Sequence, residues 1–169
     1  MNVKKTDLTK AALALGLGVC FPMLSGSLSK AVAADTPYAY EIKLSFSAEA
    51  IARMKGLKQK ITVSNAFYGD AVPAAKARAD SGNELDMGFE NSDVKAVDQT
   101  LRVTGQPLKR SVLRDIVDQK PYVLINVISG PSGANQLSCG VFEDHIAVAQ
   151  TQPVDIHCEA VPEDLVGKE

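Results

Sequence analysis

The segment Pro121-Tyr-Val-Leu-Ile-Asn-Val-Ile-Ser129 carries β-branched and other apolar side chains on both faces of an extended chain. In a strand every second side chain points to the same side, so Val123, Ile125 and Val127 share one face. The opposite face is also apolar, apart from Asn126. With Pro121 before it and a Gly-Pro pair after it, the run predicts a central strand covered on both faces by further layers.

Shorter segments show the patterns of further strands. Apolar and polar side chains alternate cleanly in residues 40–46 and 153–161. Weaker strand patterns occupy residues 60–68, 85–89, 98–104 and 137–142, with turns expected at residues 69–70 and 91–93. About six or seven short strands are typical of a sandwich of two sheets.

Helical patterns are few and short. Residues 48–55 are expected to form a helix with Ser47 as its N-cap and Gly56 as its C-cap. Residues 108–118 fit a short amphipathic helix, with an edge strand as the alternative, and one or two helical turns are expected in residues 143–150.

These patterns predict a mainly β protein, an antiparallel β-sandwich of transthyretin-like or immunoglobulin-like kind with one to three short helices. The immunoglobulin-like alternative is the weaker one, because the chain lacks the tryptophan that packs on the disulfide of antibody domains.

Residues 1–34 have the order of a secretory signal peptide, which leaves residues 35–169 as a single domain. A basic start is followed by an apolar run over residues 11–24, then by the small residues that signal peptidase prefers. Cleavage is expected after Ala34, with Ala33 as the alternative. The apolar run is too short and too broken by glycine and proline to favour a permanent membrane anchor.

A lipoprotein is a minor alternative, because Leu17-Gly18-Val19-Cys20 partly matches a lipidation motif. Val19 departs from that motif, which favours a small residue before the cysteine. A mature chain that begins at Asp35 would exclude lipidation of Cys20.

The charge of the expected mature chain argues against nucleic-acid binding. Cleavage removes four lysines and one aspartate and leaves 14 basic and 19 acidic residues, a net charge of −5. This mildly acidic composition has no basic track for a polyanion. The chain also contains no Asn-x-Ser/Thr sequon, which favours a bacterial periplasmic or secreted protein over a glycosylating secretory route.

Cys139 and Cys158 are the two cysteines of the expected mature chain. In an exported domain two cysteines most simply form one disulfide, and two buried free thiols are the alternative. Cys158 lies on the inward face of the strand pattern in residues 153–161, where it would meet Cys139.

The sequence offers no set of residues that defines a catalytic centre. His145 and His157 are the histidines of the chain, too few for a three-histidine metal site. Ser132 lies between glycines but lacks the spacing of a nucleophile elbow, and phosphate-binding glycine motifs are missing. No cofactor and no catalytic residue is therefore expected, which favours a non-enzymatic protein and leaves an enzyme as the alternative.

Three segments resemble small exported bacterial proteins of unassigned activity. They are Ile61-Thr-Val-Ser-Asn-Ala-Phe-Tyr-Gly-Asp70, Leu137-Ser-Cys-Gly-Val-Phe-Glu-Asp144 and Val154-Asp-Ile-His-Cys158. The resemblance implies a location in the bacterial envelope and supplies no site residue.

The leading hypothesis is a non-enzymatic binding or accessory module of the bacterial periplasm. It would contact a protein or envelope component through two polar loops, residues 70–82 and 130–136. The candidate contact residues in these loops are Asp70, Lys76, Arg78, Asp80 and Asn135. The alternative is a small periplasmic metal-binding protein or hydrolase that uses His145 and His157.

Aromatic residues offer a further candidate surface beside the first loop. Tyr38, Tyr40, Phe67 and Tyr68 could form a recognition patch there, although at least two of them are expected to complete the core.

Overall fold

The computed structural model describes residues 36–130, 135–163 and 166, so the predicted signal peptide, Cys20 and Ser132 lie outside the described residues. The elements, in chain order, are β1 (Tyr40–Phe46), α1 (Ala48–Leu57), β2 (Ile61–Asp70), η1 (Pro73–Arg78), β3 (Glu84–Val94), β4 (Gln99–Val103), η2 (Arg110–Asp115), η3 (Val117–Gln119), β5 (Tyr122–Ser129), β6 (Leu137–Cys139), β7 (Phe142–His145), α2 (Ile146–Ala149) and β8 (Val154–Ala160). In the described part of the chain, no helix combines the length and the apolar character needed to cross a bilayer.

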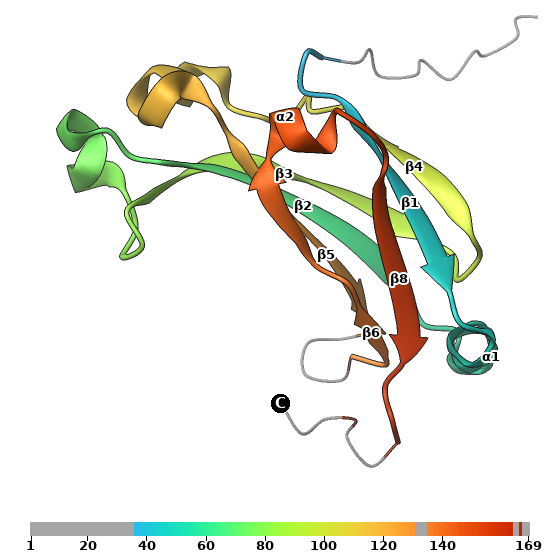
Figure 1. Cartoon of the computed structure of the whole chain (residues 1–169). Helices are drawn as coiled ribbons and strands as arrows, with labels where there is room; N and C mark the ends of the chain where they lie inside the picture. Colours follow the sequence, from blue (N-terminus) through green and yellow to red (C-terminus); the bar gives the residue numbers. More distant parts are fainter. Residues whose placement is uncertain (1–35, 131–134, 164–165, 167–169) are drawn as a thin grey trace, which may run out of the picture. The chain divides into compact units, whose positions relative to one another are not determined.

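The strands form two four-stranded sheets (Figure 1). The first sheet has the order β4-β1-β8-β6 and the second has the order β3-β2-β5-β7. The mainly β prediction is confirmed, but the sheets are not wholly antiparallel, because β1 and β8 run parallel with Ile42 opposite Val154. These two strands come from opposite ends of the domain, so no hairpin turn forces them to run antiparallel.

The inner faces of both sheets contribute to one apolar core. Ile42 and Leu44 of β1 are buried, as are Val63 and Phe67 of β2. The strict alternation of apolar residues in β1 and β8 therefore predicted their inward faces correctly.

One polar side chain, Asn65 of β2, is buried in the middle of this core. The Tyr40 hydroxyl donates a hydrogen bond of 2.8 Å to Asn65 Oδ1, and Asn65 Nδ2 donates one of 3.0 Å to the carbonyl oxygen of Glu90. Burial, with the charge of Glu90 adding to it, raises the pKa of Tyr40, so its hydroxyl remains a donor. The two sheets are thus joined by a buried hydrogen bond whose polar groups are both satisfied.

The central strand of the sequence, β5, lies inside the second sheet between β2 and β7. Val123, Ile125 and Val127 are buried on its inner face, but Ile128 on the outer face is 40% exposed. The prediction that β5 is covered on both faces is wrong. Its second apolar face belongs to a surface of the protein.

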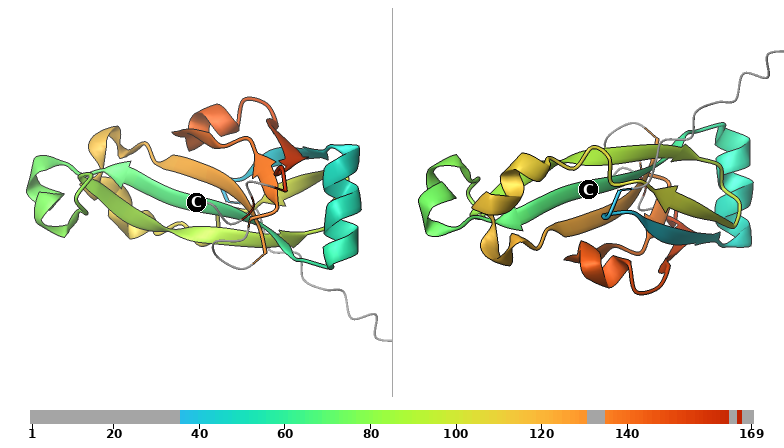
Figure 2. Two further views of the ribbon diagram at one scale, coloured as in Figure 1. Left: turned by 90° about the horizontal axis from the view of Figure 1, so that it is seen from below. Right: turned by 90° about the horizontal axis from the view of Figure 1, so that it is seen from above.

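The caps of α1 differ in how well the sequence predicted them. Ser47 Oγ accepts a hydrogen bond of 3.1 Å from the amide of Ala50, which confirms the N-cap. Gly56 lies inside the helix, and the left-handed C-cap is Lys58, with φ of 52°. The helix crosses one end of the strands of the second sheet, and η1 lies at the opposite end (Figure 2).

Strands β2 and β3 are longer than their sequence patterns indicate. Residues 69–70 and 91–93, expected to be turns, continue the two strands as cross-strand pairs, with a shift of register between Phe67 and Tyr68. Polar residues on the outer face pair across the strands, as in the 3.1 Å hydrogen bond from Thr62 Oγ1 to Asp93 Oδ1. Cross-strand pairing therefore overrides the local turn signal.

The segments at the far end of the second sheet form 3-10 helices. Residues 71–82, expected to be an exposed loop, contain η1 and bury Ala71 and Ala75. Residues 108–118, expected to be one helix, form η2 and part of η3 with Ile116 between them, which bridges to Ala71. Gly69 permits this contact, because a Cβ atom there would lie 2.7 Å from Ile116 Cδ1.

The helix expected in residues 143–150 begins later than predicted. Residues up to His145 belong to β7, and α2 occupies four residues, Ile146–Ala149. The Asp144 carboxylate accepts a hydrogen bond from the amide of His145 and does not cap the helix.

The predicted disulfide is confirmed between Cys139 of β6 and Cys158 of β8. The two residues are directly paired in the first sheet, and Cys158 is fully buried. The bond attaches the short edge strand β6 to its neighbour.

Reduction of this disulfide should destabilise the protein. The bond closes a loop with a sequence separation of 19, and a loop of that size contributes about 3 kcal/mol. Urea unfolding with and without reductant measures the difference. An unchanged unfolding midpoint would contradict the prediction, and a Cys139→Ser/Cys158→Ser variant should show the same loss without reductant.

Replacement of Tyr40 by phenylalanine should lower the free energy of unfolding by about 1–3 kcal/mol, because it leaves the buried Asn65 oxygen without its partner from β1. Chemical unfolding of Tyr40→Phe measures this cost. Tyr38→Phe is the matched control, since Tyr38 is only partly buried at the edge of the core. Equal small effects in both variants would show that the buried bond contributes little.

Candidate binding face

A row of stacked rings crosses the outer face of the second sheet. Tyr68 of β2, Tyr122 of β5 and His145 of β7 are cross-strand neighbours. The ring centroids of Tyr68 and Tyr122 are 5.3 Å apart, and those of Tyr122 and His145 are 3.8 Å apart, with interplanar angles of 13° and 24°. We call these three residues the aromatic ladder.

Carboxylates flank the ladder. The Tyr68 hydroxyl donates a hydrogen bond of 2.6 Å to Glu143 Oε1. Burial, this hydrogen bond and the nearby negative charges raise the pKa of Tyr68. Burial and the charges of Asp80, Asp70 and Glu143 also raise the pKa of Glu84. The end of the face next to the ladder is therefore electronegative.

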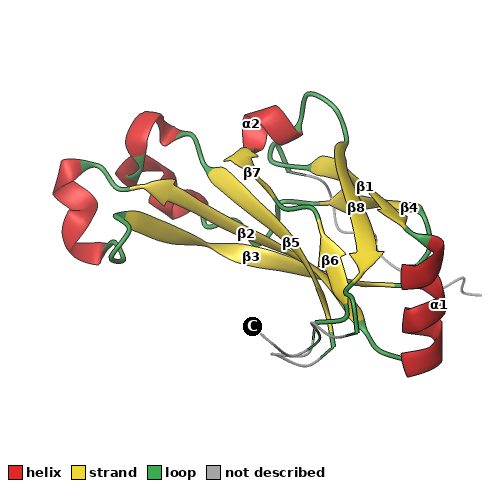
Figure 3. Ribbon diagram, turned by 60° about the horizontal axis from the view of Figure 1, so that its bottom comes forward, coloured by secondary structure: helices red, strands yellow, loops and turns green. Residues whose placement is uncertain are grey.

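Apolar side chains continue the face beyond the ladder. Ala66, the next outward residue of β2, pairs with Phe89 of β3 and Leu124 of β5. Phe89 is 63% exposed, the most exposed large apolar side chain among the described residues. The helices lie at the ends of the strands and beside β7, so they leave the middle of this sheet uncovered (Figure 3).

The described residues of the two loops proposed as a contact surface lie at opposite ends of the second sheet. Ile61 pairs with Ser129 at one end, and Tyr68 pairs with Tyr122 near the other. The ten residues of β2, at about 3.3 Å each, separate the loops by about 30 Å. A single compact partner site cannot include both.

The candidate residues of these loops have mainly structural contacts. Arg78 Nη2 lies 3.0 Å from Asp115 Oδ2, whereas Lys76 is exposed. Asp80 Oδ1 accepts hydrogen bonds of 2.9 Å from the amides of Gly82 and Glu84. These contacts fix the conformation of the loop that precedes β3.

Asn135 has a similar role at the other end of the sheet. Its Oδ1 accepts hydrogen bonds from the amide and the hydroxyl of the buried Ser129. Of the five loop candidates, Asp80 and Asp70 contribute to the environment of the ladder, because their charges raise the pKa of Glu84.

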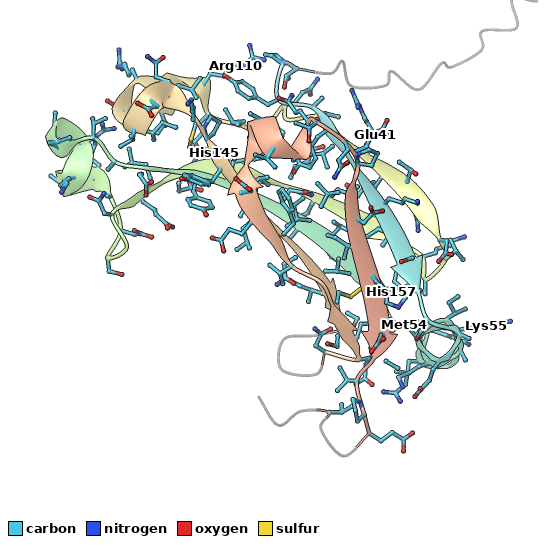
Figure 4. The ribbon with its side chains drawn as sticks, viewed as in Figure 1. Glu41, Met54, Lys55, Arg110, His145 and His157 are labelled. Atoms are coloured by element: carbon cyan, nitrogen blue, oxygen red, sulfur yellow. A yellow bond between two sulfur atoms is a disulfide. The ribbon has the colours of Figure 1, made fainter. Side chains whose placement is uncertain are left out.

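The two histidines are not brought together. His145 belongs to the ladder on the second sheet, and His157 lies on the exposed side of β8 in the first sheet, 2.9 Å from Ser45 Oγ (Figure 4). Among residues 36–130, 135–163 and 166, no group of three or more His, Cys, Asp or Glu side chains is placed to hold a metal ion.

The four aromatic residues noted in the sequence divide between core and surface. Tyr40 and Phe67 are buried, which confirms that at least two of them complete the core. Tyr38 is partly buried and carries Arg110 over its ring at 5.9 Å. Only Tyr68 belongs to the ladder. Its partners Tyr122 and His145 were missed because their pairing depends on strand register.

Comparison of the chain with protein-family models, with curated proteins and with solved structures finds no match. The resemblance to small exported bacterial proteins stays a prediction.

The electrostatics of the ladder make a testable prediction about Glu84. Because the pKa of Glu84 is raised in the folded state, the folded protein binds this proton more tightly than the unfolded chain does. The stability of the protein should therefore fall as the pH rises from the ordinary pKa of Glu84 to its folded-state pKa. Asp80→Asn keeps the oxygen that accepts the two amide hydrogen bonds but removes a charge, so it should lower the pKa of Glu84. NMR titration of the carboxyl carbons measures this pKa. Asp155→Asn, on the first sheet, should leave it unchanged, and an equal response to both substitutions would contradict the prediction.

Proposed function

We propose that this protein is an exported, non-enzymatic binding or accessory module of the bacterial periplasm, built as a β-sandwich of transthyretin-like or immunoglobulin-like kind. The contact surface is the outer face of the second sheet, in place of the two loops. The stacked row of Tyr68, Tyr122 and His145 on an uncovered sheet is the observation that carries this proposal.

Aromatic side chains are well suited to such a contact. They bury a large area at low conformational cost, and they are enriched at the centres of protein interfaces. The neighbouring Phe89 adds exposed apolar area in the same region of the sheet. Exposed apolar surface of this kind is typical of sites that bind another molecule.

The flanking charges favour a partner with a basic surface. Glu84 and Glu143 lie beside the ladder, and the face of the Tyr68 ring that is not stacked on Tyr122 can attract a cation. A lysine or arginine side chain on a protein or envelope component would meet both the rings and the carboxylates. The partner proposed here is therefore a positively charged protein surface.

Site-specific photocrosslinking in bacterial cells tests the proposal. A photoreactive phenylalanine analogue at Phe89 should capture a protein partner, and the same analogue at Lys43, exposed on the first sheet, should not. Tyr68→Ala with Tyr122→Ala should abolish the Phe89 crosslink. With the captured partner purified, these substitutions should weaken binding by about 30-fold, as expected for residues at the centre of an interface.

Equal capture at Phe89 and Lys43 would overturn the proposal, as would a Phe89 crosslink that survives loss of both tyrosines. Far-ultraviolet circular dichroism of the purified double variant serves as the folding control, since both side chains lie on the outer face.

A further inference from the structure

A groove beneath α1 forms a second candidate site, separate from the aromatic ladder. It lies between α1, the start of β2, the end of β3 and the segment that follows β3, and its volume is about 440 Å³. This volume falls within the range of pockets that bind small molecules. Its apolar lining consists of Ile51, Met54, Ile61, Val94, Ala96 and Val97.

The groove has a buried floor and an open rim. Met54 and Ile61 are 3% and 1% exposed, whereas Val97 at the rim is 49% exposed. Met54 lies on the strand side of α1, and Lys55 extends into solvent (Figure 4). A thioether side chain adapts readily to a flexible apolar ligand, so this floor suits an alkyl chain.

The charged residues of the groove are both cations, Lys55 and Lys95. The two acidic residues next to the lining residues in sequence, Asp93 and Asp98, already have partners. Asp93 Oδ2 lies 2.7 Å from Lys60 Nζ, and this hydrogen bond is the largest cause that lowers the pKa of Asp93. Asp98 Oδ1 accepts a hydrogen bond of 3.0 Å from the amide of Phe46. The rim of the groove is therefore complementary to an anion.

Gln59 adds a polar group to the lining. Its Oε1 atom is buried and has no hydrogen-bond partner among the described residues. A half-turn of the side-chain amide exchanges Oε1 for the Nε2 donor, so the same side chain can donate a hydrogen bond to an anionic group. A buried amide oxygen without a partner is costly, and a ligand head group that pairs with the reoriented amide would relieve that cost.

We propose that this groove binds a free single-chain amphiphile with an anionic head group. The alkyl chain lies on Met54 and Ile61, and the head group lies between Lys55 and Lys95 within reach of Gln59. This binding function goes beyond the contact face on the second sheet and does not depend on it.

Titration calorimetry with monomeric dodecanoate tests the proposal. We expect saturable binding with one site per chain, and no binding of dodecyltrimethylammonium at the same concentrations. Decanoate should bind more weakly, by up to about fourfold for each methylene removed.

Charge reversal identifies the site. Lys55→Glu with Lys95→Glu should weaken dodecanoate binding by about tenfold, and both positions are exposed, so the fold should be retained. Lys43→Glu with Lys76→Glu is the matched control, because these exposed lysines lie away from the groove and make the same change in net charge. The control should bind dodecanoate as the unmodified protein does.

Three results would overturn the proposal. They are the absence of saturable dodecanoate binding, an equal loss of binding in both charge-reversal variants, and binding to vesicles of anionic phospholipid without binding of the monomeric amphiphile. The last result would indicate that the two lysines contact a membrane surface and do not bind a free amphiphile.

Discussion

The hydrogen bond from Tyr40 to Asn65 is the constraint on which the arrangement of the two sheets depends. An amide buried in an apolar core must find partners, and here one comes from the facing sheet and the other from the backbone of β3. A shift of β2 by one residue would turn Asn65 outward together with its apolar neighbours. The hydrogen bonds of Asn65 and the burial of the apolar side chains of β2 therefore favour the same register.

Because the inner faces are used for the core, the outer face of the second sheet is available for contacts. Three strands bring Tyr68, Tyr122 and His145 into one row although they are far apart in the chain. The same pairing places Glu143 beside Tyr68, which makes the row both aromatic and electronegative. The groove beneath α1 is apolar and rimmed by lysines. The protein thus has two candidate surfaces near opposite ends of the second sheet. The ladder favours a cationic partner, and the groove favours an anionic ligand.

Local sequence patterns predicted those elements in which apolar and polar residues alternate strictly. Strands β1 and β8, the cap of α1 at Ser47 and the disulfide follow from neighbouring residues or from the count of cysteines. The second half of β3 and the 3-10 segments were mispredicted, because their conformations depend on cross-strand pairs and on the contact of Ile116 with Gly69. The candidate contact surface in the two loops was chosen from local composition, and it stays a prediction. The row of stacked rings on the sheet face could not be found in that way, because it depends on strand register.

By itself, the sequence determined that the chain is rich in short strands, that two cysteines are available for one disulfide, and which residues of β1 and β8 face the core. These properties depend on side-chain alternation and composition, which are local. Only the tertiary structure decided that β1 and β8 run parallel, that β5 exposes one of its apolar faces, and that Tyr68, Tyr122 and His145 stack. These features depend on which strands become neighbours and in what register, and that choice is made by the burial of the whole core at once.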